Sequence, residues 1–263
     1  MKFHLMAKFL LLIKIVFVPV FGWMIKTRQT ISNRNFVATC LFMFTLLISI
    51  NGYGQVTVTS QVSDDNDDAE ERVSDGNMSR GSSDLELTSD GGTNQLVGLR
   101  FRNINVPQGA TIVSADIQFT VDETDSGSTS VVIRGQDAND PGNFSNSDDD
   151  ISDRTLTSAS VAWNNIPAWN SVGQSGVDQQ TPNLGTIVQE IVNRGGWSSG
   201  NAMVFVITGS GERTAESHDG SSSRAPVLTI VYSTGPAISI GDVTVNEDDG
   251  TAVFTATHIG TNT

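Results

Sequence analysis

The sequence predicts an all-β protein: a jelly-roll-like antiparallel β-sandwich with one short capping helix, followed by the first strands of an immunoglobulin-like domain. Three observations lead to this fold class. Between residues 56 and 232, short apolar runs alternate with clusters of Gly, Asn, Asp and Ser, which is typical of many strands joined by turns. One segment, residues 181–196, has helical periodicity. No cysteine follows Cys40, so a packed core, not disulfide bonds, must hold the fold together.

Residues 1–54 are interpreted as an export signal region. Residues 36–50 form an apolar run that follows basic residues, and we expect cleavage after Gly54. This run is shorter than the roughly 20 residues that a membrane-spanning helix needs. A second apolar stretch, residues 9–23, has two explanations: either Met24 is the true first residue, or the stretch is a membrane anchor. The sequence thus indicates a secreted or surface-displayed protein.

Charge restricts the partners of the mature chain. All 29 acidic residues follow Gly54, as do nine of the 15 basic ones, which leaves a net charge of −20. Such a field repels nucleic acid and anionic membranes and attracts cations. We therefore exclude nucleic acid as a partner, and we expect membrane contact only through an uncleaved N-terminal anchor. The acidity has two explanations, general solubility and calcium binding.

The strand patterns fall into two kinds. Residues 99–102 and 116–121 alternate between apolar and polar side chains, which predicts half-buried strands. Residues 203–207 are apolar on both faces, and residues 227–232 are nearly so. These two segments are predicted to be central strands that are covered on each side.

The helix is expected between two recognisable end signals. Thr181 can serve as its N-cap and Pro182 as its first helical residue, and Gly195 and Gly196 end it. We expect this helix to lie across an open end of the sandwich, with its apolar stripe in the core. The stripe consists of Leu184, Ile187, Val188, Ile191 and Val192.

The chain divides into successive parts. Residues 55–232 are long enough for one well-filled β-sandwich domain, and residues 233–236 form a linker. A new alternating stretch begins at residue 237 and ends at residue 263. We interpret residues 237–263 as the start of a second domain, truncated here, in a longer surface protein.

Short motifs in a characteristic order connect the sandwich to a known class. The motifs are LRF at 99–101, VPQGATI at 106–112, SADI at 114–117, VAWN at 161–164, GW at 196–197, GNA at 200–202, ER at 212–213, APVL at 225–228 and Tyr232. Together they resemble the DNRLRE class of extracellular β-sandwich modules, whose relatives bind acidic polysaccharides such as alginate. The resemblance implies a carbohydrate-binding module.

The C-terminal stretch carries a second resemblance. Residues 238–256, ISIGDVTVNEDDGTAVFTA, are similar to the opening of a Calx-beta domain, an immunoglobulin-like calcium-binding repeat. A glutamate at this turn coordinates the ion in calcium-binding members of that family. The resemblance therefore implies Glu247 as a calcium ligand.

The densest acidic segment begins at residue 64. Asp64, Asn66 and Asp68 have the spacing that opens an oxygen-lined calcium loop. The pattern then departs from such a loop, because Ala69 stands where a Gly is needed and Asp75, not Glu, occupies the twelfth position. A solvated acidic segment is the alternative interpretation.

A second acidic cluster lies in the long loop at residues 137–154. Asp148 and Asp150 belong to a run of three aspartates in this loop. Carboxylates this close together repel one another unless a cation joins them. The cluster is therefore a second candidate calcium site, with a solvated loop as the alternative.

Aromatic side chains provide the candidates for stacking on a sugar ring. Trp163 and Trp197 stand at motif positions and are expected in the core. Trp169 follows a proline in a polar loop beside Asn170. Both a core position and a carbohydrate-binding position are open for Trp169, with Asn170 as its polar neighbour.

The loop at residues 209–223 contains the remaining candidates for ligand binding. Arg213 can form a bidentate pair with a carboxylate, either internal or from a uronic acid. His218 is expected in the same site. A catalytic role for His218 beside Asp219 is not favoured, because no nucleophile elbow or metal-binding histidine pair accompanies it.

The sequence thus favours a non-catalytic extracellular module that binds a polysaccharide and belongs to a larger calcium-binding surface protein. A structural adhesin segment, stiffened by calcium and without a glycan ligand, is the alternative. Because the mature chain is so acidic, the sequence favours a neutral glycan, or an anionic glycan held through Ca²⁺.

Overall fold

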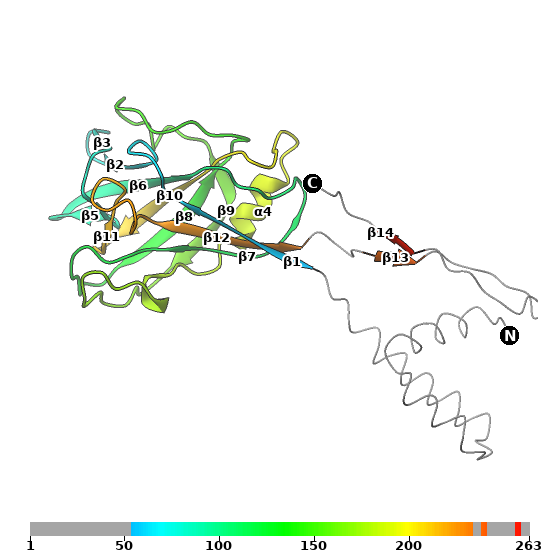
Figure 1. The fold of residues 1–263 in the computed structure, drawn as a ribbon. Coiled ribbons are helices and arrows are strands. Elements are labelled where there is room, and N and C mark those ends of the chain that lie inside the picture. Colours follow the sequence, from blue (N-terminus) through cyan, green and yellow to red (C-terminus); the bar gives the residue numbers. More distant parts are fainter. Residues whose placement is uncertain (1–53, 234–237, 241–255, 259–263) are drawn as a thin grey trace, which may run out of the picture. The chain divides into compact units, whose positions relative to one another are not determined.

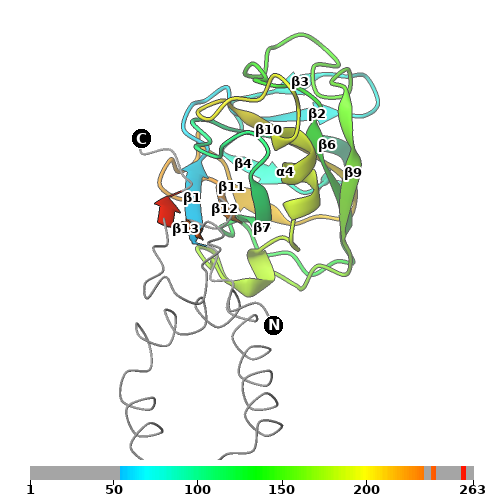
Figure 2. The same cartoon turned by 90° about the vertical axis from the view of Figure 1, so that its right-hand side faces the viewer.

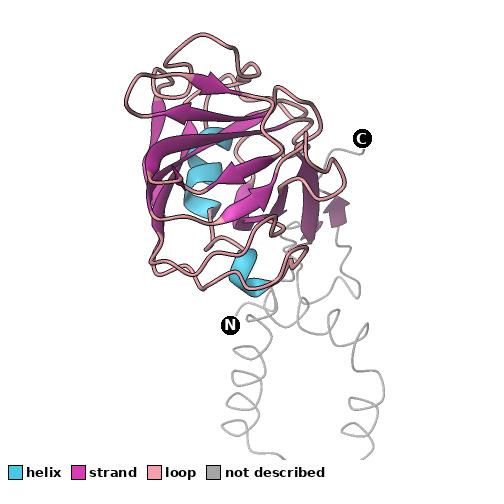
Figure 3. Ribbon diagram, turned by 90° about the vertical axis from the view of Figure 1, so that its left-hand side faces the viewer, coloured by secondary structure: helices cyan, strands magenta, loops and turns pink. Residues whose placement is uncertain are grey.

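Antiparallel strands dominate the structure, and the predicted all-β sandwich with one short α-helix is confirmed for the described residues (Figure 1). The computed structural model describes residues 54–233, 238–240 and 256–258. Residues 55–235 form one compact unit, which contains both hydrophobic clusters of the described chain. Because this unit buries its core within its own residues, we expect it to fold on its own. Figure 3 shows that strands and loops make up most of the unit.

The smaller sheet has three strands in the order β1-β12-β7. Gln55 pairs with Ser233, so the chain enters and leaves the unit at neighbouring positions. At the other end of the same ladder, Gln61 pairs with Val227. The strands are β1 (Gln55–Gln61), β7 (Thr111–Gln118) and β12 (Val227–Ser233).

The larger sheet has the order β3-β2-β6-β10-β8-β9, and β5 pairs with β6 beside this path. A separate two-stranded ribbon is formed by β4 and β11. The strands of the larger sheet are β2 (Asp68–Arg72), β3 (Met78–Ser79), β5 (Ser89–Asp90), β6 (Thr93–Phe101), β8 (Ser130–Gln136), β9 (Leu156–Trp163) and β10 (Met203–Ser210). The ribbon consists of β4 (Asp84–Glu86) and β11 (Thr214–Glu216).

The main core contains the inward side chains of both sheets. Leu99 and Phe101 of β6 are buried, and so is Ile117 of β7, as the alternating patterns predict. The rings of Phe101 and Phe205 meet edge to face with their centroids 5.9 Å apart. Such a pair adds about 1 kcal/mol to the stabilisation that comes from burial alone.

A second, smaller core covers the outer face of the larger sheet. Phe144 and Ile151 of the long loop at residues 137–155 pack there with Val204 and Val206 of β10. Gly98 of β6 leaves room for this loop, because a Cβ atom there would lie 2.5 Å from the Phe144 ring. β10 is therefore buried on both faces, as predicted.

For β12 the prediction was only partly right. This strand lies in the centre of its sheet, with Leu228 and Ile230 buried on the inner face. Its outer side chains, such as Thr229 and Val231, are half-exposed. Within the described residues, this outer face thus has no covering layer comparable to the loop over β10.

The helix α4 (Gly185–Val192) begins later than predicted. Thr181 does not cap it; the Thr181 hydroxyl accepts the backbone N–H of Ile117 at 2.9 Å, and Asn183 accepts that of Ala115 at 3.0 Å. The segment before the helix therefore pairs with the edge of β7. A short 3-10 helix, η1 (Val177–Gln179), precedes this segment.

The position of α4 agrees with the prediction. It packs against β7 on one side and against β8 and β9 on the other, so it closes the gap between the two sheets (Figure 2). Its apolar stripe, from Leu184 to Val192, is buried in the main core.

Two short strands beyond the unit form an antiparallel pair, β13 (Ile238–Ile240) with β14 (Ala256–His258). The predicted calcium ligand Glu247 lies outside the described residues, as do residues 234–236 of the predicted linker at 233–236 and residues 1–53 of the predicted export signal at 1–54. Ser233 belongs to β12. Among the residues that are described, no helix is long and apolar enough to cross a membrane.

Candidate functional site

Arginines neutralise the predicted calcium loop between β1 and β2. The Asp67 carboxylate is buried and forms ion pairs with Arg100, at 2.7 Å, and with Arg102, at 2.5 Å. Arg102 also contacts Asp64 at 3.1 Å. Two guanidinium groups thus lie where the sequence suggested a cation.

The three expected ligands of this loop have other partners. Asp64 accepts the backbone N–H of Asn66, and the side-chain oxygen of Asn66 accepts a hydrogen bond from Arg80. Asp68 belongs to β2, is buried, and accepts the backbone N–H of His218 at 2.8 Å. In the structure these three side chains therefore bind other groups of the protein, and the calcium site of Asp64, Asn66 and Asp68 stays a prediction.

His218 links two aspartates to the loop before β12. Its Nδ1 atom lies 2.9 Å from Asp65 Oδ1, in addition to the bond from its backbone to Asp68. Burial, against the lowering effect of the His218 N–H and with a smaller contribution from the nearby Asp219 carboxylate, raises the pKa of Asp68 to about 6. His218 thus serves to position a loop, and its imidazole already contacts the Asp65 carboxylate.

The second predicted calcium cluster lies in the loop over the larger sheet. Asp150 pairs with Arg154 at 3.2 Å and accepts the backbone N–H of Ser145. The Arg154 guanidinium also lies over the Phe144 ring, 4.4 Å from its centroid. Asp148 is exposed to solvent. Arg154 thus supplies the positive charge beside Asp150 that the sequence pattern suggested for calcium.

Trp169 is a core residue. Its side chain is 0% exposed, its Nε1 donates to the Asp178 carbonyl at 3.1 Å, and its ring packs against Phe119. The expectation that Trp169 stacks on a sugar is thereby corrected, although its neighbour Asn170 is exposed. All eight aromatic side chains between residues 55 and 233 are buried, so this segment presents no aromatic platform to a glycan.

Arg213 is also buried, with 1% exposure. Its guanidinium donates to four backbone carbonyls, those of Gly127, Ile166, Pro167 and Glu212, and to the Thr129 hydroxyl. These five contacts use all the N–H donors that an arginine has. Arg213 therefore fastens three loops together and has no donor left for a uronic acid, which corrects the expected glycan contact.

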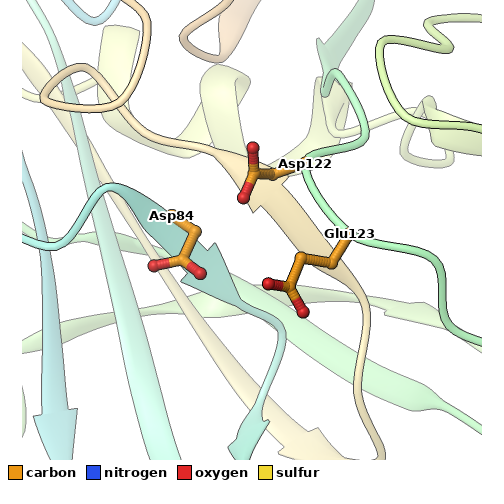
Figure 4. Close-up of side chains that lie close together, drawn as sticks. All are labelled: Asp84, Asp122 and Glu123. Atoms are coloured by element: carbon orange, nitrogen blue, oxygen red, sulfur yellow. The ribbon is translucent and has the colours of Figure 1, made fainter.

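A carboxylate cluster that the sequence patterns did not reveal lies beside the β4-β11 ribbon. One carboxylate oxygen each from Asp84, Asp122 and Glu123 lies within 4.8 Å of the other two. Figure 4 shows the three carboxyl groups converging on a common space. Asp84 and Asp122 are half-buried and Glu123 is exposed, so the cluster is open to solvent.

The β11 strand brings these residues together. Leu85 of β4 pairs with Ala215 of β11, and Ala215 forms a bridge with Val121 on its other side. Ala215 thus lies between Leu85 and Val121. Asp84 precedes Leu85 and Asp122 follows Val121, so the two aspartates are brought to the same side of the molecule. The carboxylates therefore meet because of backbone pairing between segments that are far apart in the chain.

Like charges accumulate around this cluster. Partial burial raises the pKa of Asp122, and the carboxylates of Glu216, Asp84 and Glu123 raise it further. Glu70 is buried nearby, where desolvation and a hydrogen bond with Glu86 raise its pKa well above the ordinary value. A bound cation would relieve this repulsion, and carboxylate oxygens are the ligands that Ca²⁺ prefers.

The local sequence carries little sign of the cluster. Asp84 follows two serines and has one other carboxylate, Glu86, two residues after it, and Asp122 and Glu123 are separated from it by 37 residues or more. Their spacing matches no calcium-loop pattern. Only the pairing of β4 with β11 would have revealed it.

Comparison with known proteins supplies no relative: no protein-family model matches the chain, and a search of curated proteins finds no match.

Proposed function

We propose that this chain is a non-catalytic structural module of an extracellular surface protein, stiffened by a calcium ion at the Asp84, Asp122 and Glu123 cluster. The observation that supports this proposal is the convergence of three carboxylate oxygens within 4.8 Å of one another. A structural role is favoured over glycan binding for a separate reason. Trp169 and Arg213, the side chains best suited to hold a sugar, are buried.

The position of the cluster suits a stiffening role. A cation there would join β4 to the segment that follows β7, two stretches of the chain that both pair with β11. Three carboxylates provide fewer oxygens than the six to eight that Ca²⁺ takes, so water or backbone carbonyls must complete its shell. We therefore expect weak binding, with a Kd of about 0.1–1 mM, in the range of extracellular calcium modules.

The resemblances described above support the wider setting of the proposal. The motifs at residues 99–232 resemble those of extracellular β-sandwiches, and residues 238–256 are similar to the opening of a Calx-beta domain. In this setting the module is carried on a larger, secreted calcium-binding protein.

Calorimetric titration of residues 55–235 with Ca²⁺, paired with thermal melting, tests the calcium site. We expect saturable binding and a raised Tm, and we expect Asp84→Asn and Asp122→Asn each to weaken binding about tenfold. Asp148→Asn is the matched control, because Asp148 is an exposed member of the other acidic cluster. Binding that Asp148→Asn weakens as much as Asp122→Asn does would place the ion elsewhere and contradict the assignment.

Glycan binding is a second candidate, at a different place from the one expected. The outer face of the β1-β12-β7 sheet presents mainly hydroxyl and amide side chains, including Thr57, Thr59, Thr229 and Gln61. Among the described residues of these three strands, Asp116 is the one charged side chain on this face, and Gln180 donates to it at 2.7 Å. A face this poor in charge suits a neutral glycan.

Retention on neutral and acidic polysaccharides, with calcium and with EDTA, separates the two candidates. If the unit is a structural module, we expect no retention on any of the polysaccharides and a Tm that calcium still raises. Retention on a neutral polysaccharide that Thr229→Glu abolishes would favour the glycan-binding face instead.

A further inference from the structure

The edges of the two sheets are closed in different ways. The outer edge of β7 pairs with the segment before α4, through the Thr181 and Asn183 side chains. The outer edge of β9 is covered in part by Glu190 of α4, which accepts the N–H groups of Ser158 and Ala159 at 2.8 and 2.7 Å. β3, at the remaining edge of the larger sheet, has only two residues.

β1 differs from these edges. It has seven residues and ends the smaller sheet, and within the described residues it pairs with β12 alone. Val62 donates its N–H to the Pro226 carbonyl, and this bond shows which β1 residues form hydrogen bonds with β12 and which do not. By this alternation, Val56, Val58 and Ser60 direct their backbone groups toward β12, and Thr57 and Thr59 direct theirs outward.

The composition of β1 leaves this edge unprotected. Its sequence, QVTVTSQ, contains no charge and no proline, and these are features that usually prevent edge-to-edge pairing. The rest of the unit is strongly acidic: residues 55–233 contain 25 acidic and nine basic residues, a net charge of −16. Two copies of the unit can therefore approach along β1 without placing like charges in the paired strands.

We propose that β1 is the contact surface for a second copy of this chain, with the two β1 strands paired antiparallel about Val58. A two-fold axis there places Thr57 opposite Thr59 of the second copy, and Gln55 opposite Gln61. These four residues are the ones whose backbone groups point outward, so the same register pairs every outward N–H with a carbonyl. The strand is thus complementary to itself.

Side chains support the same register. Val58 is half-buried at the edge of the core, and Val56 is 41% exposed. In the pair, Val58 meets Val58 of the second copy and Val56 meets Ser60, which extends the apolar inner face across the contact. On the outer face, threonine lies opposite threonine, a favourable cross-strand pair. The two sheets join into one of six strands, in the order β7-β12-β1-β1-β12-β7.

Charge sets the strength of this contact. One paired strand covers less area than a standard protein interface, so the dimer is expected to be weak. Two units with a charge of −16 also repel each other, and salt screens that repulsion. Self-association should therefore increase with ionic strength, the reverse of the trend for a contact held by ion pairs.

Sedimentation of residues 55–235 at about 50 mM and about 500 mM NaCl tests the proposal. We expect a monomer–dimer equilibrium whose dissociation constant falls about tenfold at the higher salt. Hydrogen exchange should slow at the Thr57 and Thr59 amides as the protein concentration rises, while the Val58 amide, already paired with β12, keeps its rate. A unit that stays monomeric at millimolar concentration and high salt would overturn the proposal.

Three variants locate the contact. Thr57→Pro removes an outward N–H but no bond to β12, and Thr59→Glu adds a charge to the edge; each should raise the dissociation constant about tenfold or more. Thr111→Glu is the matched control, an exposed threonine on β7 at the far edge of the same sheet. Melting curves confirm that each variant folds. Equal weakening by Thr59→Glu and Thr111→Glu would show that net charge, not strand pairing, governs association, and would refute the β1 contact.

Discussion

The Nε atom of Arg102 lies 2.5 Å from the buried carboxylate of Asp67. Arg100 approaches the other oxygen of the same carboxylate at 2.7 Å. Both arginines come from the end of β6 and the residue after it, where they alternate with Leu99 and Phe101 of the core. The strand that fills the core therefore also supplies the positive charge that stabilises the acidic loop before β2.

Asp67→Asn should reduce the free energy of unfolding by about 3 kcal/mol, because it leaves two guanidinium groups without their buried counter-charge. Urea denaturation of residues 55–235 measures the change. Asp75→Asn is the control, since Asp75 pairs with Arg72 in an exposed position where such a pair contributes little. Equal losses in the two variants would argue against a special role for the buried pair.

Arg213→Lys should cost about 2–4 kcal/mol, although it keeps the charge. A lysine has three donors and cannot satisfy the five acceptors that the guanidinium reaches in the structure. The loops that contain Gly127, Ile166 and Glu212 should also exchange their amide hydrogens faster. A variant as stable as the parent protein would contradict the role of Arg213 as a fastener of loops.

Stability should rise as the pH is lowered from 7 toward 4, in part because of Asp68. Its pKa of about 6 in the folded protein lies above the ordinary value, so the folded state binds a proton that the unfolded state does not bind in this range. Above pH 6 both states are ionised, and the folded state bears the full cost of the buried charge. At a pH below the ordinary pKa of aspartate, Asp68 is protonated in both states, and neither state bears the cost of the buried charge.

Asp68→Asn removes this dependence, because the amide is neutral at every pH. The variant should be more stable than the parent protein by about 2 kcal/mol at pH 7, with a difference that shrinks toward pH 4. Denaturation curves at several pH values in this range provide the measurement. A difference that stays constant over the range would show that the effect of the substitution does not arise from titration.

Glu71 should control the mobility of the loop over the larger sheet. Its buried carboxylate accepts the N–H groups of Ile151 and Ser152 at 2.7 and 2.8 Å. Glu71→Gln weakens these charge-assisted bonds, and we expect hydrogen exchange in residues 145–154 to accelerate about fivefold. Exchange in β12 serves as the internal control. Acceleration of β12 to the same degree would indicate global destabilisation instead.

The sequence was a good guide wherever a periodic pattern determines burial. The alternation around Leu99 and Ile117 and the doubly apolar run of β10 led to the right strands, because burial of apolar area is decided by local spacing. The predicted start of α4 was wrong because Thr181 resembles an N-cap in sequence. In the structure the Thr181 hydroxyl accepts the N–H of Ile117 at the edge of β7. No local sequence pattern distinguishes a threonine that caps a helix from one that bonds to a strand edge.

The candidate site was harder to predict, for two physical reasons. Trp169 stands among polar residues along the chain, yet its indole turns inward against Phe119, a contact between distant segments. Asp84 and Asp122 meet only because β11 lies between their strands. Charge clusters that arise from such pairing are invisible to spacing rules, whereas runs such as residues 64–68 are conspicuous and are neutralised by arginines in the structure.

The pairing of Gln55 with Ser233 determines how the unit would respond to mechanical force. Tension applied between these two residues pulls β1 and β12 away from each other across the ladder, so the residue pairs separate in succession from Gln55 toward Gln61. Strands loaded in this way peel at lower force than strands that must slide past each other, where all the bonds break together. Under a load applied at these two residues, β1 would therefore be the first strand to leave the fold.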